Sequence, residues 1–208
     1  MNGWVKVCGI TTAEAVAAAA EAGADAIGFV FAASPRRVRA DRALELARPV
    51  RQQLSCVAVT QHPTQFEVDQ IVREFHPEML QTDLDDFIAL HLPQRLARLP
   101  VLRAAPSGTA ARASGALTEY PPRLLYEGAR SGSGEVSDWQ QAAEIARHTR
   151  LVLAGGLHAG NVAEAIRVVR PFGVDASSGL ESRPGVKDTG KITAFVRAAR
   201  AAFSEIEA

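Results

Sequence analysis

The chain has 208 residues, 47% hydrophobic and 22% charged, which is enough to bury the core of one domain. Its 23 basic residues balance its 23 acidic residues, and a net charge of zero argues against a surface for nucleic acid or an anionic membrane. The two cysteines, the absence of a signal-peptide pattern and the absence of an apolar run of about 18 residues predict a soluble cytoplasmic protein that does not cross a membrane.

Short apolar segments alternate with longer segments of helical pattern along the whole chain. Because the short segments are apolar on both faces, they are typical of parallel strands buried under helices. The predicted strands are Val5–Cys8, Ala26–Val30, Cys56–Thr60, Met79–Gln81, Val101–Arg103, Leu124–Glu127, Leu151–Ala154 and Gly173–Asp175.

The segments between these strands predict helices, since several carry apolar residues at helical spacing. Residues 107–115, between the fifth and sixth strands, are short and flanked by glycine, and they predict about one or two helical turns. The other predicted helices are Thr12–Ala22, Asp41–Leu54, Gln65–Phe75, Asp85–Arg98, Ser137–His148, Asn161–Val169 and Lys191–Ala202.

This alternation favours a single α/β domain over residues 1–208, folded as a closed (β/α)8 barrel of the TIM-barrel type. An open, doubly wound parallel sheet is the alternative. Against it, the first strand–helix turn lacks the G-x-G-x-x-G sequence of dinucleotide-binding sheets. In a closed barrel the active site lies at the carboxyl ends of the strands, so unusual residues at those ends are the candidates.

Two glycine-containing loops follow the last two predicted strands. Gly155 and Gly156 follow the seventh strand, and Ser178 and Gly179 follow the eighth. Small residues let backbone N–H groups approach an anion closely, and barrels often bind phosphate at this place. Tight turns without a ligand are the alternative, but the two loops together favour a phosphate site.

Cys8 ends the first predicted strand, and Lys6 faces the same side because it lies two residues earlier. A cysteine can remove a proton from carbon as the thiolate if the pKa of its thiol is lowered, and a nearby cation lowers that pKa. A buried, inert thiol is the alternative. Cys56 starts the third strand, away from the barrel mouth, and we expect it only to pack.

Glu127 ends an otherwise apolar strand, where a carboxylate is costly unless it is paired or functional. In a partly dry pocket such a carboxyl can act as a general acid, and a structural salt bridge to Lys6 is the alternative. Asp175 is expected to orient its neighbours.

The five histidines are scattered, and neither a P-loop nor a nucleophile-elbow motif is present, so we expect no metal and no cofactor.

Arg36 and Arg37 follow the second strand and are candidates to bind an acidic group of a substrate, because guanidinium donors match an oxyanion. A solvated loop charge is the alternative for each of them. The residues themselves do not separate the two arginines.

Several longer segments of the chain form recognisable motifs: VKVCGIT (5–11), GADAIGFVF (23–31), LAGGL (153–157) with NV (161–162), and VDASSGLE (174–181) with PGVKD (184–188). In the same order along the chain, these segments resemble the signature segments of phosphoribosylanthranilate isomerases. The resemblance implies the Amadori rearrangement of N-(5-phosphoribosyl)anthranilate to 1-(2-carboxyphenylamino)-1-deoxyribulose 5-phosphate, a step of tryptophan biosynthesis, in a barrel without a cofactor.

The resemblance also implies roles for single residues. The catalytic base of the family falls on Cys8, its general acid falls on Glu127, and the arginine of its Ser-Pro-Arg segment falls on Arg36, which leaves Arg37 as the solvated neighbour. The residues assigned to substrate and phosphate binding are Lys6, Arg36, Gly155, Gly156, Asp175, Ser178 and Gly179.

Three positions depart from the family pattern. Glu127 replaces an aspartate, Asp83 stands where a histidine is usual, and Thr60 ends the third strand in place of asparagine. These departures suggest a divergent subgroup and keep open a non-catalytic or altered-substrate phosphoribosyl-binding barrel. A related isomerase of histidine biosynthesis is disfavoured, because Cys8 stands where that family has an acidic base. The sequence leaves a monomer and a homodimer open.

Overall fold

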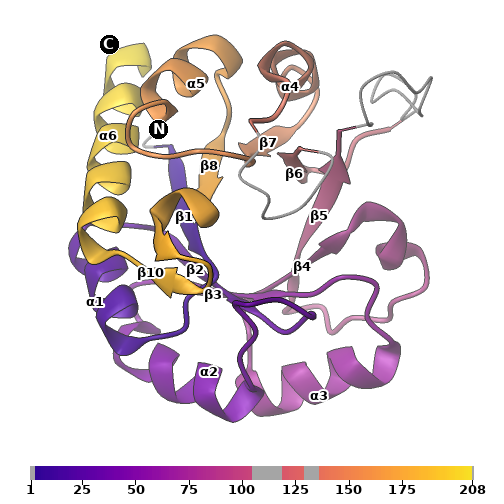
Figure 1. Ribbon diagram of the computed structural model, residues 1–208. Helices are drawn as coiled ribbons and strands as arrows, with labels where there is room; N and C mark the ends of the chain where they lie inside the picture. Colours follow the sequence, from indigo (N-terminus) through magenta and orange to yellow (C-terminus); the bar gives the residue numbers. More distant parts are fainter. Residues whose placement is uncertain (1–2, 105–118, 129–135, 208) are drawn as a thin grey trace.

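The computed structural model describes residues 3–104, 119–128 and 136–207, and these form a ring of strands surrounded by helices (Figure 1). Strands β1 to β8 are parallel and paired in chain order, and β8 pairs with β1 to close the barrel. The predicted (β/α)8 barrel is confirmed, and the open sheet is wrong. The strands are β1 (Trp4–Cys8), β2 (Ala26–Val30), β3 (Ser55–Val59), β4 (Met79–Asp83), β5 (Ala97–Arg103), β6 (Arg123–Glu127), β7 (Arg150–Leu153) and β8 (Gly173–Ala176).

The helices lie outside the ring, with α2 and α3 along one side and α6 along another (Figure 1). After β8 the chain forms a 3-10 turn and the two-stranded sheet β9–β10 before α6 begins. None of the described helices is long and apolar enough to cross a membrane. These elements are α1 (Ala13–Glu21), α2 (Ala40–Ala47), α3 (Gln65–Phe75), α4 (Trp139–Ala146), α5 (Val162–Val169), α6 (Thr189–Glu207), the 3-10 helices η1 (Arg48–Val50), η2 (Leu84–Ile88) and η4 (Ser178–Leu180), and the strands β9 (Glu181–Arg183) and β10 (Val186–Lys187).

The helix predicted over Asp85–Arg98 is wrong. This stretch contains the short 3-10 helix η2, and β5 already begins at Ala97, which pairs with Met79 of β4. Pro93 accounts for the break, because proline has no backbone N–H and disfavours helical conformation in the residue before it.

The helix predicted over Asp41–Leu54 is shorter than expected. The α-helix ends at Ala47, and the 3-10 helix η1, with Pro49 as its central residue, follows it before a turn over residues 51–53. The turns predicted over residues 107–115 lie outside the described residues.

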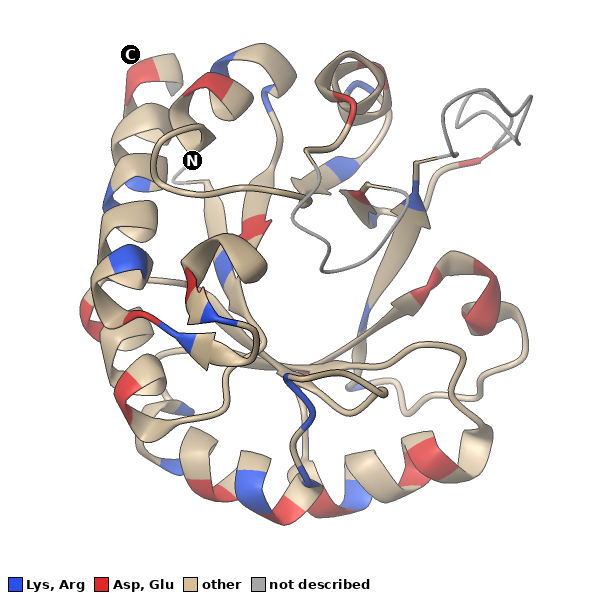
Figure 2. Ribbon diagram, viewed as in Figure 1, with Lys and Arg blue, Asp and Glu red and all other residues tan. Residues whose placement is uncertain are grey.

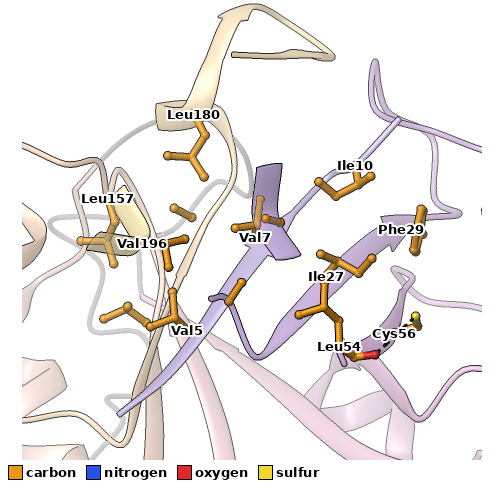
Figure 3. Close-up of a cluster of buried hydrophobic side chains, with 14 of the residues drawn as sticks. Val5, Val7, Ile10, Ile27, Phe29, Leu54, Cys56, Leu157, Leu180 and Val196 are labelled. Carbon is orange, nitrogen blue, oxygen red and sulfur yellow. Dashed lines mark hydrogen bonds between the residues drawn. The ribbon is translucent and has the colours of Figure 1, made fainter. Parts of the chain in front are cut away.

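Side chains alternate between the inside and the outside of the barrel along each strand. Val5 and Val7 of β1 and Ile27 of β2 belong to the main core between strands and helices, where Val196 of α6 also lies (Figure 3). Two smaller apolar clusters fill the barrel interior. The barrel is therefore packed, and a ligand has room only at its mouth.

Charged residues of both signs are interspersed on the outer helices, as α2 and α3 show along one side of Figure 2. This mixture follows from the balanced composition. The charges able to act on a small anion at the barrel mouth are therefore those carried by the strand ends and by the segments that follow the strands.

Candidate active site

A pocket of about 150 Å³ opens where the strands reach their carboxyl ends. Every residue predicted for the site lines this pocket except Lys6. The predicted residues in its wall are Cys8, Arg36, Glu127, Gly155, Gly156, Asp175, Ser178 and Gly179.

Lys6 lies beneath the pocket, fully buried, and does not reach its surface. Its Nζ donates to both carboxylate oxygens of Asp175 at 3.0 Å. Burial alone would lower the pKa of Lys6, but the charges of Asp175 and Cys8 outweigh burial and raise it. Lys6 is therefore a charged group that acts on the pocket from below, and its salt bridge is with Asp175 and not with Glu127.

Cys8 points into the barrel from the end of β1, and a glycine on the neighbouring strand makes room for it. A Cβ atom on Gly28 of β2 would lie 2.9 Å from the Cys8 Sγ. Burial raises the pKa of the Cys8 thiol, and the cations Lys6 and Lys187 oppose this only in part. The pKa of the Cys8 thiol is thus raised, and not lowered as expected for a thiolate base.

Glu127 ends β6 and is 8% exposed. Its Oε1 accepts a hydrogen bond from Nη1 of Arg103, the last residue of β5, and Arg103 lines the same pocket. Nε of Arg103 also donates to Oδ1 of Asp83 at 2.8 Å. Sequence analysis missed Arg103, although a charged residue that ends an apolar strand was the signal that identified Glu127.

Arg36 enters the pocket wall from the loop after β2 and is held in a second ionic cluster. Its Nε and Nη2 donate to the two carboxylate oxygens of Glu181 at 2.7 and 2.9 Å. The Nζ of Lys187 donates to Oε1 of the same carboxylate at 2.6 Å. Burial would raise the pKa of Glu181, but these two cations hold it below its ordinary value. Arg37 is exposed, as expected for the solvated neighbour.

The two predicted phosphate loops have backbone conformations that depend on glycine. Gly155 and Gly156 adopt φ angles of 93° and 62°, which residues with side chains rarely adopt. A Cβ atom on Gly179 would lie 2.2 Å from the backbone oxygen of Leu157, so the loops after β7 and β8 touch one another. Both loops line the same pocket.

One group of potential metal ligands was not anticipated from the sequence. Ligand atoms of His62, Asp83 and Asp86 lie within 4.8 Å of one another. The carboxylates already have partners, since Arg103 binds Asp83, and Asp86 accepts a hydrogen bond from Thr82 at 2.5 Å. We therefore assign no metal to this group.

Cys56 is buried, and its Sγ donates to the backbone oxygen of Leu54 at 3.9 Å (Figure 3). It does not line the pocket, which agrees with the packing role expected for it.

Comparison with known proteins identifies a family model and relatives that share one enzyme name. Residues 5–198 match the family model for N-(5'-phosphoribosyl)anthranilate (PRA) isomerase. An enzyme of that name from Roseiflexus sp. (strain RS-1) is 42% identical over 211 residues, which cover 95% of this chain and 98% of the relative. Another, from Rhodopseudomonas palustris (strain ATCC BAA-98 / CGA009), is 38% identical and covers 97% and 100% of the two chains.

Solved structures of phosphoribosyl anthranilate isomerases share the fold. The enzyme from Thermotoga maritima has a TM-score of 0.82 at 29% identity, over 96% of this chain and 99% of its own. A structure in complex with reduced 1-(o-carboxyphenylamino)-1-deoxyribulose 5-phosphate has a TM-score of 0.79 at 28% identity, with the same coverage.

Proposed function

The chain belongs to the N-(5'-phosphoribosyl)anthranilate isomerase family, and on that premise we propose that Cys8 and Glu127 are its catalytic base and acid. The protein is an aldose–ketose isomerase of tryptophan biosynthesis and converts N-(5-phosphoribosyl)anthranilate into 1-(2-carboxyphenylamino)-1-deoxyribulose 5-phosphate. The observation that supports the two roles is that a thiol from β1 and a carboxyl from β6 line one pocket.

The reaction needs one proton donor and one proton acceptor. Glu127 donates a proton to the furanose ring oxygen, the C1–oxygen bond breaks, and the nitrogen lone pair forms a Schiff base with C1. Cys8, as the thiolate, then removes the proton from C2, and the electron pair moves to give the enolamine. Tautomerisation, with protonation at C1, gives the ketose. General acid–base steps of this kind require only that the two groups reach opposite parts of one small sugar.

The phosphate and the anthranilate carboxylate of the substrate each need a binding contact. We assign the phosphate to the backbone N–H groups of the loops around Gly155, Gly156, Ser178 and Gly179. Arg36 is assigned to the anthranilate carboxylate, because its guanidinium lines the pocket and suits an oxyanion.

Lys6 and Asp175 act from below on the thiol. Because burial raises the pKa of Cys8, the thiolate needs cations nearby, and both Lys6 and Lys187 favour the ionised form. In this proposal Lys6 supports Cys8 without contacting the substrate, and Asp175 orients Lys6.

Two substitutions test the proposal. Cys8→Ala and Glu127→Gln should each lower kcat by about 10² to 10⁴-fold, while circular dichroism and the melting temperature stay close to those of the parent. Cys56→Ala is the matched control, because it removes a thiol away from the pocket, and it should keep full turnover. Near-parental kcat in either active-site variant would reject the role assigned to that residue.

Both cysteines are free thiols, and we infer from this that the enzyme works in a reducing compartment, the cytoplasm. The catalytic and substrate-binding residues proposed above all line one pocket within one copy of the chain. We therefore propose that turnover does not require a second copy, whether the protein is a monomer or a homodimer in solution. Equal specific activity on dilution through any dimer dissociation would support this, and loss of activity with dissociation would contradict it.

A further inference from the structure

The pocket wall formed by β4, β5 and β6 holds one cation between two carboxylates. Arg103 donates through Nε to Oδ1 of Asp83 at 2.8 Å and through Nη1 to Oε1 of Glu127. Asp83 and Glu127 are 9% and 8% exposed, so both carboxyls are largely removed from water. A planar guanidinium that binds two partners at once has little freedom to rotate.

We propose that Arg103 and Asp83 are positioning residues for the isomerase reaction: Arg103 fixes the carboxyl of Glu127 at the pocket wall, and Asp83 holds and neutralises Arg103. The inference rests on the proposed role of Glu127 as the general acid. Neither positioning residue has to touch the reacting atoms.

The balance of charge explains why a second carboxylate is useful here. A general acid must carry its proton when the substrate arrives, but a guanidinium beside a carboxyl favours the form that has lost the proton. Asp83 offsets part of the charge of Arg103, and this favours proton uptake by Glu127 relative to an Arg103 that lacks the carboxylate partner. Arg103 therefore keeps Glu127 in place, and Asp83 keeps it able to hold a proton.

Other charged groups face this network from neighbouring elements. His62, after β3, places Nε2 at 3.5 Å from Oδ2 of Asp83 and Nδ1 at 3.0 Å from Oδ1 of Asp86 on η2. Asp83 Oδ2 is buried and makes no hydrogen bond within the described part of the chain. Across the pocket, the described ionisable groups in the wall are Cys8, Arg36 and Asp175.

His62 needs separate treatment in any pH experiment. Its hydrogen bond to Asp86 and the charges of both nearby carboxylates raise its pKa, so it changes charge near the network as the pH falls. A His62→Gln background removes that titration and leaves Asp83, Arg103 and Glu127 for comparison.

The test is the pH profile of kcat in the His62→Gln background. Asp83→Asn keeps the shape of the side chain but leaves the charge of Arg103 unopposed, so Glu127 loses its proton more readily. We expect the limb that reports Glu127 to move to lower pH by about one unit, and the turnover above that limb to fall about tenfold. The loss should disappear as the pH falls below the limb. Asp85→Asn is the matched control, because it removes an exposed carboxylate from η2, and it should leave the profile unchanged.

Arg103→Gln gives the opposite sign and provides the second variant. Without the cation, Glu127 holds its proton more firmly, so the same limb should move to higher pH, while the plateau kcat below the limb falls because the carboxyl loses its hydrogen bond from Arg103. A uniform loss in Asp83→Asn with an unmoved limb, or shifts of the same sign in both variants, would overturn the inference.

Glu127→Gln separates this inference from the proposed function. If Glu127→Gln retains parental turnover, the acid role itself fails, and the positioning role fails with it. If Glu127→Gln is inactive while Asp83→Asn has the parental profile, only the positioning role is wrong.

Discussion

Cys8 lies in surroundings that oppose its own ionisation. It is 6% exposed, and burial raises its pKa although Lys6 and Lys187 are close enough to act on it. Cys56 is a useful comparison, because burial raises its pKa to about 12, and the Arg51 charge opposes this rise only in part. Cys8 lines the pocket and Cys56 does not, so the difference between the two thiols is one of access.

A thiol-directed label measured by mass spectrometry tests this description. We expect a small alkylating reagent to modify Cys8 and to leave Cys56 unmodified in the folded protein. Because the Cys8 pKa is raised, its thiolate fraction and labelling rate should grow by about tenfold per pH unit through neutral and mildly alkaline pH. The product analogue should protect Cys8, and Cys56→Ala should label like the parent. A rate that levels off near neutral pH would mean that the two cations outweigh burial.

Among the secondary-structure elements, α3 and the Asp85–Arg98 segment show when the local sequence is sufficient to predict a helix and when it is not. The predicted bounds of α3, Gln65–Phe75, are confirmed. The Thr64 hydroxyl accepts a hydrogen bond from the Glu67 backbone N–H, and the Thr64 backbone N–H donates to Oε2 of Glu67. The Asp85–Arg98 segment has apolar residues too, but Pro93 and the pairing of Ala97 with β4 prevent a helix of that length.

Removing the capping group should destabilise the protein by a measurable amount. Thr64→Ala is expected to lower the free energy of unfolding by about 1 kcal/mol, because a helix N–H loses its acceptor. Thr193→Ala is the matched control, since Thr193 lies inside α6, where alanine favours helix, and its loss should cost little. Urea unfolding curves measure both. Equal stabilities of the two variants would show that the cap contributes nothing to α3.

For the molecule as a whole, closure of the barrel depends on the pairing of β1 with β8. Lys6 and Asp175 are register partners across that seam, and their side chains form a buried ion pair at 3.0 Å. Both groups are deeply buried, and the attraction of Asp175 keeps Lys6 charged despite burial. The seam thus holds a charge pair that neither strand could keep in the dry interior alone.

Breaking this pair on one side should be costly. Lys6→Met leaves the Asp175 carboxylate buried without its cation, and we expect the free energy of unfolding to fall by about 3 to 5 kcal/mol. The double variant Lys6→Met/Asp175→Asn removes both charges and should recover part of that loss. Chemical denaturation of the parent and the variants measures the coupling. If the double variant is as unstable as the sum of the two single variants, the seam does not depend on the pair.

The order of the eight strands, the closed barrel and eight of the residues that line the pocket were predictable from the amino-acid sequence, because apolar periodicity, glycine and proline act locally along the chain. Cys8 and Glu127 were identified because each ends a recognisable strand, and the two glycine loops because each follows one. The pairing of charges became apparent only in the folded barrel: Lys6 pairs with Asp175, and Glu127 pairs with Arg103. Burial in the folded barrel also raises the pKa of the Cys8 thiol. Both depend on which strands become neighbours and on how much water the fold excludes, and these are properties of the closed barrel, not of any one segment.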